Sequence, residues 1–188
     1  MNTWISEIIN EKKLLLNNLE DYISDVEYIG LILSECILNG NKIILAGNGG
    51  SAADAGHFAG ELLGRFLQER KSLPAISLCT DPSVVTCISN DYGFDEIFAR
   101  QLSGIGKLND CFIGFSTSGN SKNLINAVNI AKKMKIISIG LLGNDGGELK
   151  NICNYSLVVP SKSTPRIQEI HTFTVHLLCQ IIEKKCIK

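Results

Sequence analysis

The sequence lacks the features of a polyanion binder or a membrane-spanning protein. Its 188 residues contain 18 Lys and Arg against 19 Asp and Glu, which gives a formal charge of −1, and it has no long basic run. Binding to nucleic acid or to a membrane surface needs clustered cations, so the balance predicts neither partner. Its apolar runs also fall short of the roughly 18 residues that cross a bilayer.

Paired cysteines are missing as well. The seven cysteines are an odd, scattered number without any C-x-x-C pair. This usage is typical of reduced thiols and argues against a disulfide framework or a thiolate zinc site. The N-terminal residues interrupt their apolar positions with Glu7, Asn10 and Glu11 and lack a small-residue cleavage site, so no signal peptide is predicted. We therefore expect a cytoplasmic protein.

Proline and aromatic residues are scarce, at 4 prolines and 6% aromatics, whereas glycine occurs 17 times. This composition favours an α/β chain with glycines in the turns between strands and helices. Short apolar runs predict five strands, at 42–46, 75–79, 110–115, 135–141 and 155–159. Helical patterns between and after them cover 52–67, 82–90, 122–134, a short stretch before the fifth strand, and 165–184. The alternation predicts one parallel sheet with helices on both faces, a three-layer α/β/α domain.

The first 38 residues have a different pattern. Apolar residues recur at helical spacing from Trp4 to about Leu38, which predicts two helices broken near Asp21–Asp25. The first precedes any strand and has no obvious partner in its own chain, so we expect it to bury its apolar stripe against another subunit. The expected division is residues 1–40 for oligomer packing and 41–188 for the α/β domain, within one structural unit.

Two loops at predicted strand ends are rich in glycine and hydroxyl groups. They are Gly47–Ser51 and Ser116–Ser121, and each precedes a predicted helix. Backbone N–H groups at a helix N-terminus, together with hydroxyls, suit a phosphate monoester without any lysine. Either loop alone is equally compatible with a tight turn and a helix cap. Neither matches the nucleoside-triphosphate loop or the G-x-G-x-x-G fingerprint, which argues against kinase and NAD-binding functions.

The three histidines lie on only two predicted helices. His57 and Glu61 are four residues apart on the helix after the first loop, which suits joint metal ligation, acid–base work, or a solvated surface pair. His171 and His176 lie on the last helix with Gln168, about 140° apart, so a site would use only one of them. The spacing leaves that choice open, and leaves open a buried core histidine. Asn90–Asp91 is predicted to form an Asx turn.

Five motifs, in order and in register, carry a resemblance to a known family. They are Gly47–Asp54, His57–Leu62, Ser89–Phe98, Ser116–Ser121, and Arg166–His171 with His176. Together, from about residue 4 to residue 184, they resemble the phosphoheptose isomerases of the SIS-domain superfamily. The resemblance implies a single SIS domain, flavodoxin/Rossmann-like in architecture, with an N-terminal helical arm.

The resemblance also implies an activity and its residues. The expected reaction converts D-sedoheptulose 7-phosphate to D-glycero-D-manno-heptose 7-phosphate through an enediol, at the first step of bacterial heptose biosynthesis for lipopolysaccharide or capsule. It implies a homotetramer with sites between subunits and one Zn²⁺ per subunit, held by His57, Glu61, Gln168 and His176, with Glu61 and His176 as the acid–base pair. The implied substrate contacts are Asn48, Gly49, Gly50, Ser51, Glu61, Asn90, Asp91, Ser116, Thr117, Ser118, Ser121 and Gln168.

Two positions depart from the family pattern, and two other functions compete. Gly60 stands where relatives often have Ala or Glu, and Pro165 where many have Ala or Asp. The first alternative is a non-enzymatic SIS-domain protein that binds a replication initiator; it is expected to lack the counterparts of Glu61 and His176, which this chain has. The second, a sugar-phosphate-sensing regulator, would need a basic DNA-binding module for which the sequence has no spare length.

Overall fold

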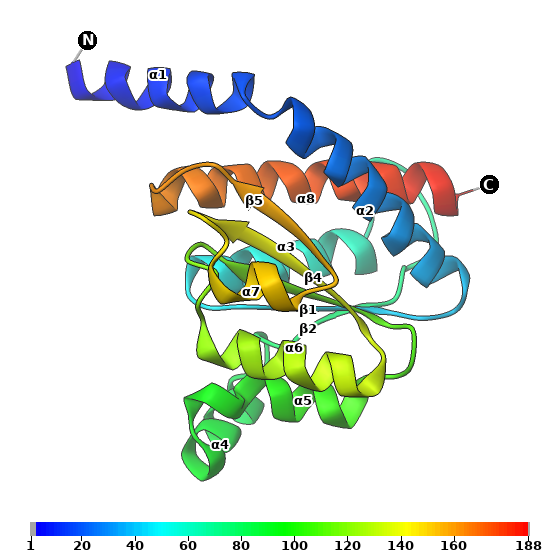
Figure 1. The fold of residues 1–188 in the computed structure, drawn as a ribbon. Coiled ribbons are helices and arrows are strands. Elements are labelled where there is room, and N and C mark those ends of the chain that lie inside the picture. The colour runs from blue at the N-terminus through cyan, green and yellow to red at the C-terminus, as the bar shows by residue number, and fades with distance from the viewer. Residues whose placement is uncertain (1–2, 188) are drawn as a thin grey trace.

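The computed structural model describes residues 3–187, and its centre is one parallel sheet of five strands (Figure 1). The strands are β1 (Ile43–Gly47), β2 (Ala75–Ser77), β3 (Cys111–Ser116), β4 (Ile137–Gly143) and β5 (Tyr155–Val159), in the order β2-β1-β3-β4-β5. In register, Leu45 of β1 lies opposite Ser77 of β2 and Ile113 of β3. The predicted strand count and parallel sheet are confirmed.

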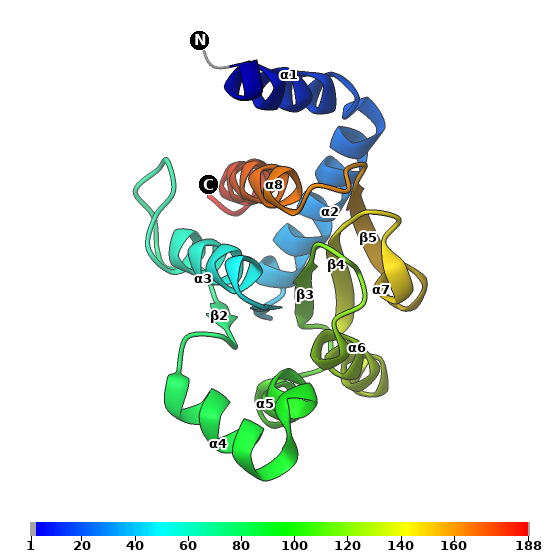
Figure 2. The ribbon, with the colours of Figure 1, turned by 90° about the vertical axis from the view of Figure 1, so that its left-hand side faces the viewer.

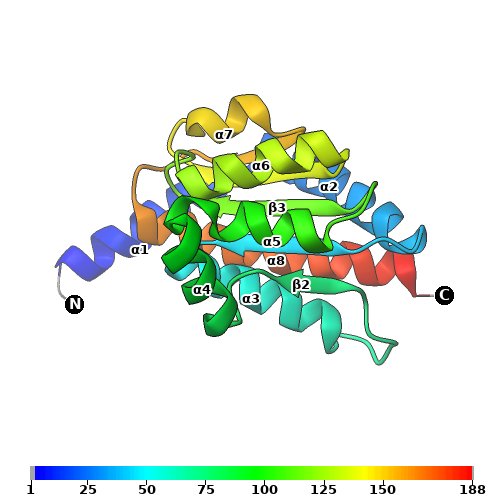
Figure 3. The ribbon, with the colours of Figure 1, turned by 90° about the horizontal axis from the view of Figure 1, so that it is seen from below.

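Helices cover both faces of the sheet. They are α1 (Thr3–Asn17), α2 (Glu20–Leu38), α3 (Gly50–Leu63), α4 (Pro82–Tyr92), the 3₁₀ helix η1 (Phe94–Glu96), α5 (Ile97–Ile105), α6 (Lys122–Met134), α7 (Gly147–Ile152) and α8 (Thr164–Cys186). Figure 2 shows α2, α3 and α8 on one side of the strands and α5, α6 and α7 on the other. Viewed from below in Figure 3, α5 and α6 lie over the sheet in front of α8.

The strands feed two separate hydrophobic cores because neighbouring side chains point to opposite faces. Ile43 and Leu45 enter the core shared with α2, α3 and α8, whereas Ile44 enters the core shared with α5 and α6. All five β1 residues are buried. This explains why the strands appear in the sequence as continuous apolar runs and not as alternating ones.

Three element boundaries and one turn differ most clearly from the sequence prediction. The break between the first two helices falls at Asn18–Leu19, and not at residues 21–25, because Glu20 lies in the first turn of α2, where an acidic residue is favourable. The third helix ends at Leu63 and not near Leu67, and the second strand ends at Ser77 and not at Cys79. The predicted Asx turn at Asn90–Asp91 is wrong, since both residues lie in the last turn of α4.

The segment Phe94–Ile105 was not predicted to be helical, and it forms η1 and α5. Its spacing carried a signal, because Ile97, Phe98 and Leu102 form one buried face against α6. Among residues 3–187, helices of the length and hydropathy required to cross a bilayer are absent.

The two N-terminal helices have different surroundings. Helix α2 packs on α8 and β5 through buried residues that include Val26, Ile29 and Leu33. Helix α1 extends away from the layers in Figure 1, and Leu15 is its one buried residue in the single chain. Within the described part of segment 1–40, α1 is therefore the helix that contacts the α/β layers least, through Leu15 and the ion pair of Lys12 with Glu169 of α8.

The C-terminus of α6 offers a test of backbone conformation. Lys135 caps this helix with φ 56° and ψ 40°, a left-handed conformation that costs a non-glycine residue about 1 kcal/mol. We expect Lys135→Gly to raise the free energy of unfolding by up to about 1 kcal/mol, measured by urea denaturation. The control Lys132→Gly, at an exposed right-handed position in the same helix, should lower it by a similar amount. A change of the same sign in the free energy of unfolding of both variants would contradict this explanation.

Candidate functional site

The two glycine- and hydroxyl-rich loops meet at the point where the strand order reverses. Loop 47–51 follows β1 and loop 116–121 follows β3, and these strands are neighbours although β2 lies between them in the chain. Ligands of open α/β sheets bind at this place. The side-chain amides of Asn48 and Asn123 join the loops by two reciprocal hydrogen bonds of 3.0 and 2.9 Å. Asn123, at the start of α6, was not predicted from the sequence.

Neither loop ends in a side-chain cap within the described residues. The N-cap of α3 is Gly49 and that of α6 is Ser121, and neither makes a side-chain capping bond, whereas Asp81 caps α4. Ser51 lies buried inside α3, so it is not the cap that a plain turn would use. The Ser116 hydroxyl accepts the N–H of Gly119 and lies 3.1 Å from the Ser121 hydroxyl. The uncapped helix starts and clustered hydroxyls can receive an anion.

Helices α3 and α8 run side by side in the same direction along one face of the sheet (Figure 2). Near their N-termini, Gly50 lies so close to Gln168 that a Cβ at Gly50 would collide with the Gln168 amide. One turn further, the Thr172 hydroxyl donates to Asp54 Oδ1 at 2.9 Å. These contacts keep the two helices in register.

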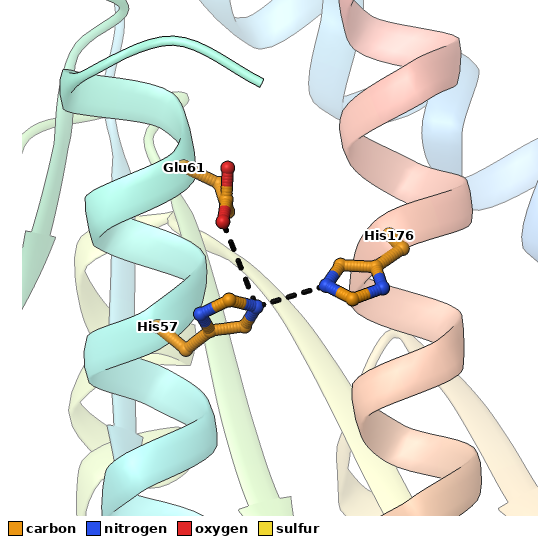
Figure 4. A group of neighbouring side chains, drawn as sticks. All are labelled: His57, Glu61 and His176. Carbon is orange, nitrogen blue, oxygen red and sulfur yellow. Dashed lines mark hydrogen bonds and ion pairs between the residues drawn. The ribbon is translucent and has the colours of Figure 1, made fainter. Parts of the chain in front are cut away.

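A further turn along, three predicted ligands come together (Figure 4). His57 Nε2 lies 2.9 Å from His176 Nε2 and 3.7 Å from Glu61 Oε1. One ligand atom from each of the three side chains lies within 4.8 Å of the other two. Imidazole nitrogens and a carboxylate oxygen that converge in this way suit a divalent transition metal, so the group can hold a metal ion. The contact across the two helices also excludes a simple surface pair of His57 and Glu61.

Gln168, the fourth predicted ligand, lies eight residues before His176 on α8. That separation is about 12 Å along the helix axis. Its amide is packed against Gly50, between the first loop and the three-residue group. The structure thus brings His57, Glu61 and His176 together and places Gln168 nearer loop 47–51.

The structure distinguishes the two histidines of α8. His171 is fully buried, its Nε2 donates to the carbonyl oxygen of Leu142 at 3.1 Å, and its ring meets the edge of Phe115. Burial lowers the pKa of His171 to about 4, against the opposing effect of its hydrogen bond to Leu142. His171 is therefore the core histidine, and His176 is the one that faces His57.

Asn90 and Asp91 lie apart from this group. Both are exposed on α4, and among the described residues their side chains bond only to each other and to Cys87. Helix α4 packs on the opposite side of the sheet from α8 (Figure 2). Within one chain, these two predicted substrate contacts do not join the three-residue group.

Three residues around the group were not found by sequence reasoning. The ring of Phe66 stacks on His176, with centroids 5.6 Å apart and planes at 28°. Arg70 and Glu183 form a buried ion pair close by, with Nε and Oε1 at 3.0 Å. The available signal was a carboxylate, Glu183, seven residues after His176 in a mostly apolar stretch of the last helix.

The two departures from the family pattern do not disturb the ligands. Gly60 is exposed with open space around its Cα, and Pro165 lies in the first turn of α8, where its fixed φ is favourable.

The chain is similar to known proteins along nearly its whole length. Residues 8–143 match the family model described as SIS domain. The chain is 48% identical to a phosphoheptose isomerase of Aliarcobacter butzleri, with 96% of each chain covered, and 49% identical to one of Sulfurimonas denitrificans, with 98% of this chain and 96% of that one covered. A solved phosphoheptose isomerase from Francisella tularensis superposes with a TM-score of 0.88 at 37% identity, covering 97% of this chain and 96% of the other.

The buried His171 predicts a pH dependence of stability. Its folded pKa of about 4 lies below the unfolded value of about 6.5, so stability from the neutral imidazole is full above pH 6.5 and is lost as the pH falls toward 4. The loss approaches about 3 kcal/mol, because one pKa unit corresponds to about 1.4 kcal/mol. Urea denaturation between pH 4 and 7 should give a shallower stability profile for His171→Gln than for the wild type. Parallel profiles would contradict the assignment.

Proposed function

The chain belongs to the phosphoheptose isomerases of the SIS-domain family, and we propose that it converts D-sedoheptulose 7-phosphate to D-glycero-D-manno-heptose 7-phosphate. This is the ketose-to-aldose step that opens heptose biosynthesis. The observation that carries the proposal is the convergence of His57, Glu61 and His176 beside two uncapped loops at the switch point of the sheet.

The loops supply the phosphate site. The N-termini of α3 and α6 carry partial positive charge, and loop 116–121 adds the hydroxyls of Ser116, Thr117, Ser118 and Ser121. The Asn48 amide is occupied by Asn123, so the first loop is expected to bind through its backbone at Asn48, Gly49 and Gly50. Ser51, buried in the first turn of α3, supports this loop.

The three-residue group lies where the reacting end of the sugar would reach. His57 and Glu61 are seven and eleven residues after Gly50, so they lie about 10 to 16 Å along α3 from the phosphate loop. Gln168 packs against Gly50 between the loop and the group, so we expect it to contact hydroxyls in the middle of the sugar. An extended seven-carbon sugar phosphate reaches the His57 end of this range, and the Glu61 side chain leans back toward the N-terminus of α3.

The reaction moves a proton between C1 and C2 through an enediol. We assign Glu61 as the base that takes the proton from carbon, because a carboxylate within reach of both helices can face the substrate. We assign His176 as the acid–base group for the oxygen atoms. It donates a proton to the carbonyl oxygen and takes one from the neighbouring hydroxyl. The contact between His57 and His176 holds the second imidazole in place for this work.

We propose Zn²⁺ as the cofactor, one ion per subunit. In a tetrahedral zinc site with bonds of about 2.1 Å, ligand atoms lie about 3.4 Å apart. The separations of 2.9 and 3.7 Å at His57 Nε2 bracket that value. The ion would be held by His57, Glu61 and His176, with Gln168 as fourth ligand after its amide turns toward the group, and it would polarise the carbonyl and stabilise enediolate charge.

We also propose a homotetramer with sites completed between subunits. Helix α1 exposes large apolar side chains, and Asn90 and Asp91 lie away from the rest of the predicted site within one chain. A neighbouring copy of the chain can bury the apolar side chains of α1 and bring its own Asn90 and Asp91 to a site. The exposed apolar residues of α1 are Trp4, Ile8, Ile9, Leu14 and Leu16.

The enzyme proposal is tested by Glu61→Gln. Loss of the base should lower kcat by roughly 10²- to 10⁴-fold while the melting temperature stays near that of the wild type. The conversion of sedoheptulose 7-phosphate is followed by NMR. The matched control is Glu69→Gln, on an exposed residue just beyond α3, which should keep full activity.

The same assay tests the cofactor. Chelation should abolish turnover and added Zn²⁺ should restore it. An absence of conversion by the wild type under every metal condition would contradict the enzyme proposal, and full activity after chelation would contradict only the metal proposal.

The oligomer proposal is tested on α1. Leu14 is 64% exposed in the single chain, so Leu14→Glu should dissociate a tetramer that buries it, because a charge would enter an apolar interface. Light scattering reports the mass of the assembly. The control Lys13→Glu changes charge without removing apolar surface and should leave the mass unchanged; dissociation of both variants alike would argue against an apolar interface at Leu14.

A further inference from the structure

The ion pair between Arg70 and Glu183 joins the two helices that carry the three-residue group. Arg70 follows α3 in the loop 64–73, and Glu183 lies near the end of α8. Their side chains are only 3% and 2% exposed, and Arg70 Nε donates to Glu183 Oε1 at 3.0 Å. A pair buried to this degree is costly to desolvate, so it needs many partners to be stable.

Arg70 completes the C-terminus of α3. Its guanidinium donates to the carbonyl oxygens of Glu61, Leu62 and Gly64, at 2.6, 2.8 and 3.1 Å. The last turn of a helix leaves such carbonyls without intrahelical partners, and a guanidinium fork can satisfy several at once. The Leu62 carbonyl also accepts the N–H of Leu73 at 3.0 Å. One of these bonds falls on the backbone of Glu61 itself, so Arg70 fixes the position from which this carboxylate projects.

Glu183 fixes the other side of the group. Its carboxylate accepts the N–H groups of Phe66, Leu67 and Gln68, at 3.1, 3.0 and 3.3 Å. Burial raises the pKa of Glu183, but the N–H donors of Leu67 and Phe66 and the Arg70 guanidinium outweigh this effect and hold its pKa below the usual range. The carboxylate thus stays ionised and holds the loop against α8.

The loop in turn holds a catalytic side chain. Phe66, whose N–H is bound by Glu183, stacks its ring on His176. The pair therefore acts on both halves of the group, through the Glu61 backbone on α3 and through the Phe66 ring on α8. Neither Arg70 nor Glu183 contacts the three ligand atoms in the described structure.

We propose that Arg70 and Glu183 are positioning residues for the acid–base and metal-binding group, and that they set the separation of α3 and α8 at His57, Glu61 and His176. This inference rests on the proposed function for the group, and it adds that the group's geometry depends on an ion pair outside it. Supporting partners of metal ligands typically govern affinity and activity by roughly 10- to 100-fold.

A second ion pair, with a buried carboxylate and a partly exposed lysine, supplies the control. Asp110, just before β3, accepts the backbone N–H groups of Lys42 and Lys107 and the Lys42 ammonium group, at 3.0, 2.8 and 2.5 Å. It is 1% exposed, and, as for Glu183, its hydrogen bonds with Lys42 and Lys107 outweigh burial and lower its pKa. Asp110 lies at the opposite end of the sheet from the loops, so Asp110→Asn removes a comparable pair far from the site.

The test compares Arg70→Lys and Glu183→Gln with Asp110→Asn. Calorimetric titration of metal-free protein with Zn²⁺ should show roughly 10- to 100-fold weaker binding for the first two and wild-type binding for the third. Their kcat should fall by a similar factor while KM changes little, because the phosphate loops lie at the other end of α3. All three variants should lose thermal stability. Equal Zn²⁺ affinity and kcat across the set would overturn the proposal.

A metal-free measurement separates this proposal from the proposed function. The NMR cross-peak between the imidazole protons of His57 and His176 should persist in Asp110→Asn and weaken in Arg70→Lys and Glu183→Gln. This holds even if the wild type binds no Zn²⁺ and does not turn over. Phe66→Leu should weaken the same cross-peak with little loss of stability. A cross-peak unchanged in all variants would contradict the positioning role.

Discussion

The parallel contact between α3 and α8 is the constraint on which the site depends. Four contacts follow one another along it, from Gly50 against Gln168, through Asp54 with Thr172 and His57 with His176, to Arg70 with Glu183. Successive positions on α8 are four, four and seven residues apart, which keeps them near one face of that helix. Because α3 starts at loop 47–51, the same contact sets how far the three-residue group lies from that loop.

The charged and polar groups of this chain act locally, so its net charge indicated little about the ligand that it binds. A formal charge of −1 argued against a broad polyanion surface, yet the anion site that we propose is made from helix N-termini and hydroxyls. Those groups add no formal charge. The buried charges of Arg70 and Glu183 cancel as a pair, as does the buried Asp110 with the partly exposed Lys42, and both pairs hold segments of backbone in place.

The sequence predicted the layers well, because they depend on local patterns. Continuous apolar runs gave all five strands, and the i,i+4 spacing placed His57 beside Glu61. The choice between His171 and His176 was beyond local pattern, since it depends on how α8 rotates against α3, and only the family resemblance pointed to His176. Arg70 and Asn123 were missed for a similar reason, because their partners lie 113 and 75 residues away.

The polar contacts between α3 and α8 select one packing register of the two helices more than they raise the free energy of unfolding. Each helix also buries apolar side chains, such as Phe58 and Leu178, in the same hydrophobic core, and these would hold the pair together in several registers. A buried ion pair adds little net stability over an apolar pair of the same volume, but a shift of one residue would leave its charges without partners. The register that pairs Arg70 with Glu183 is also the one that places His57 against His176. The packing that satisfies the buried charges therefore also assembles the site.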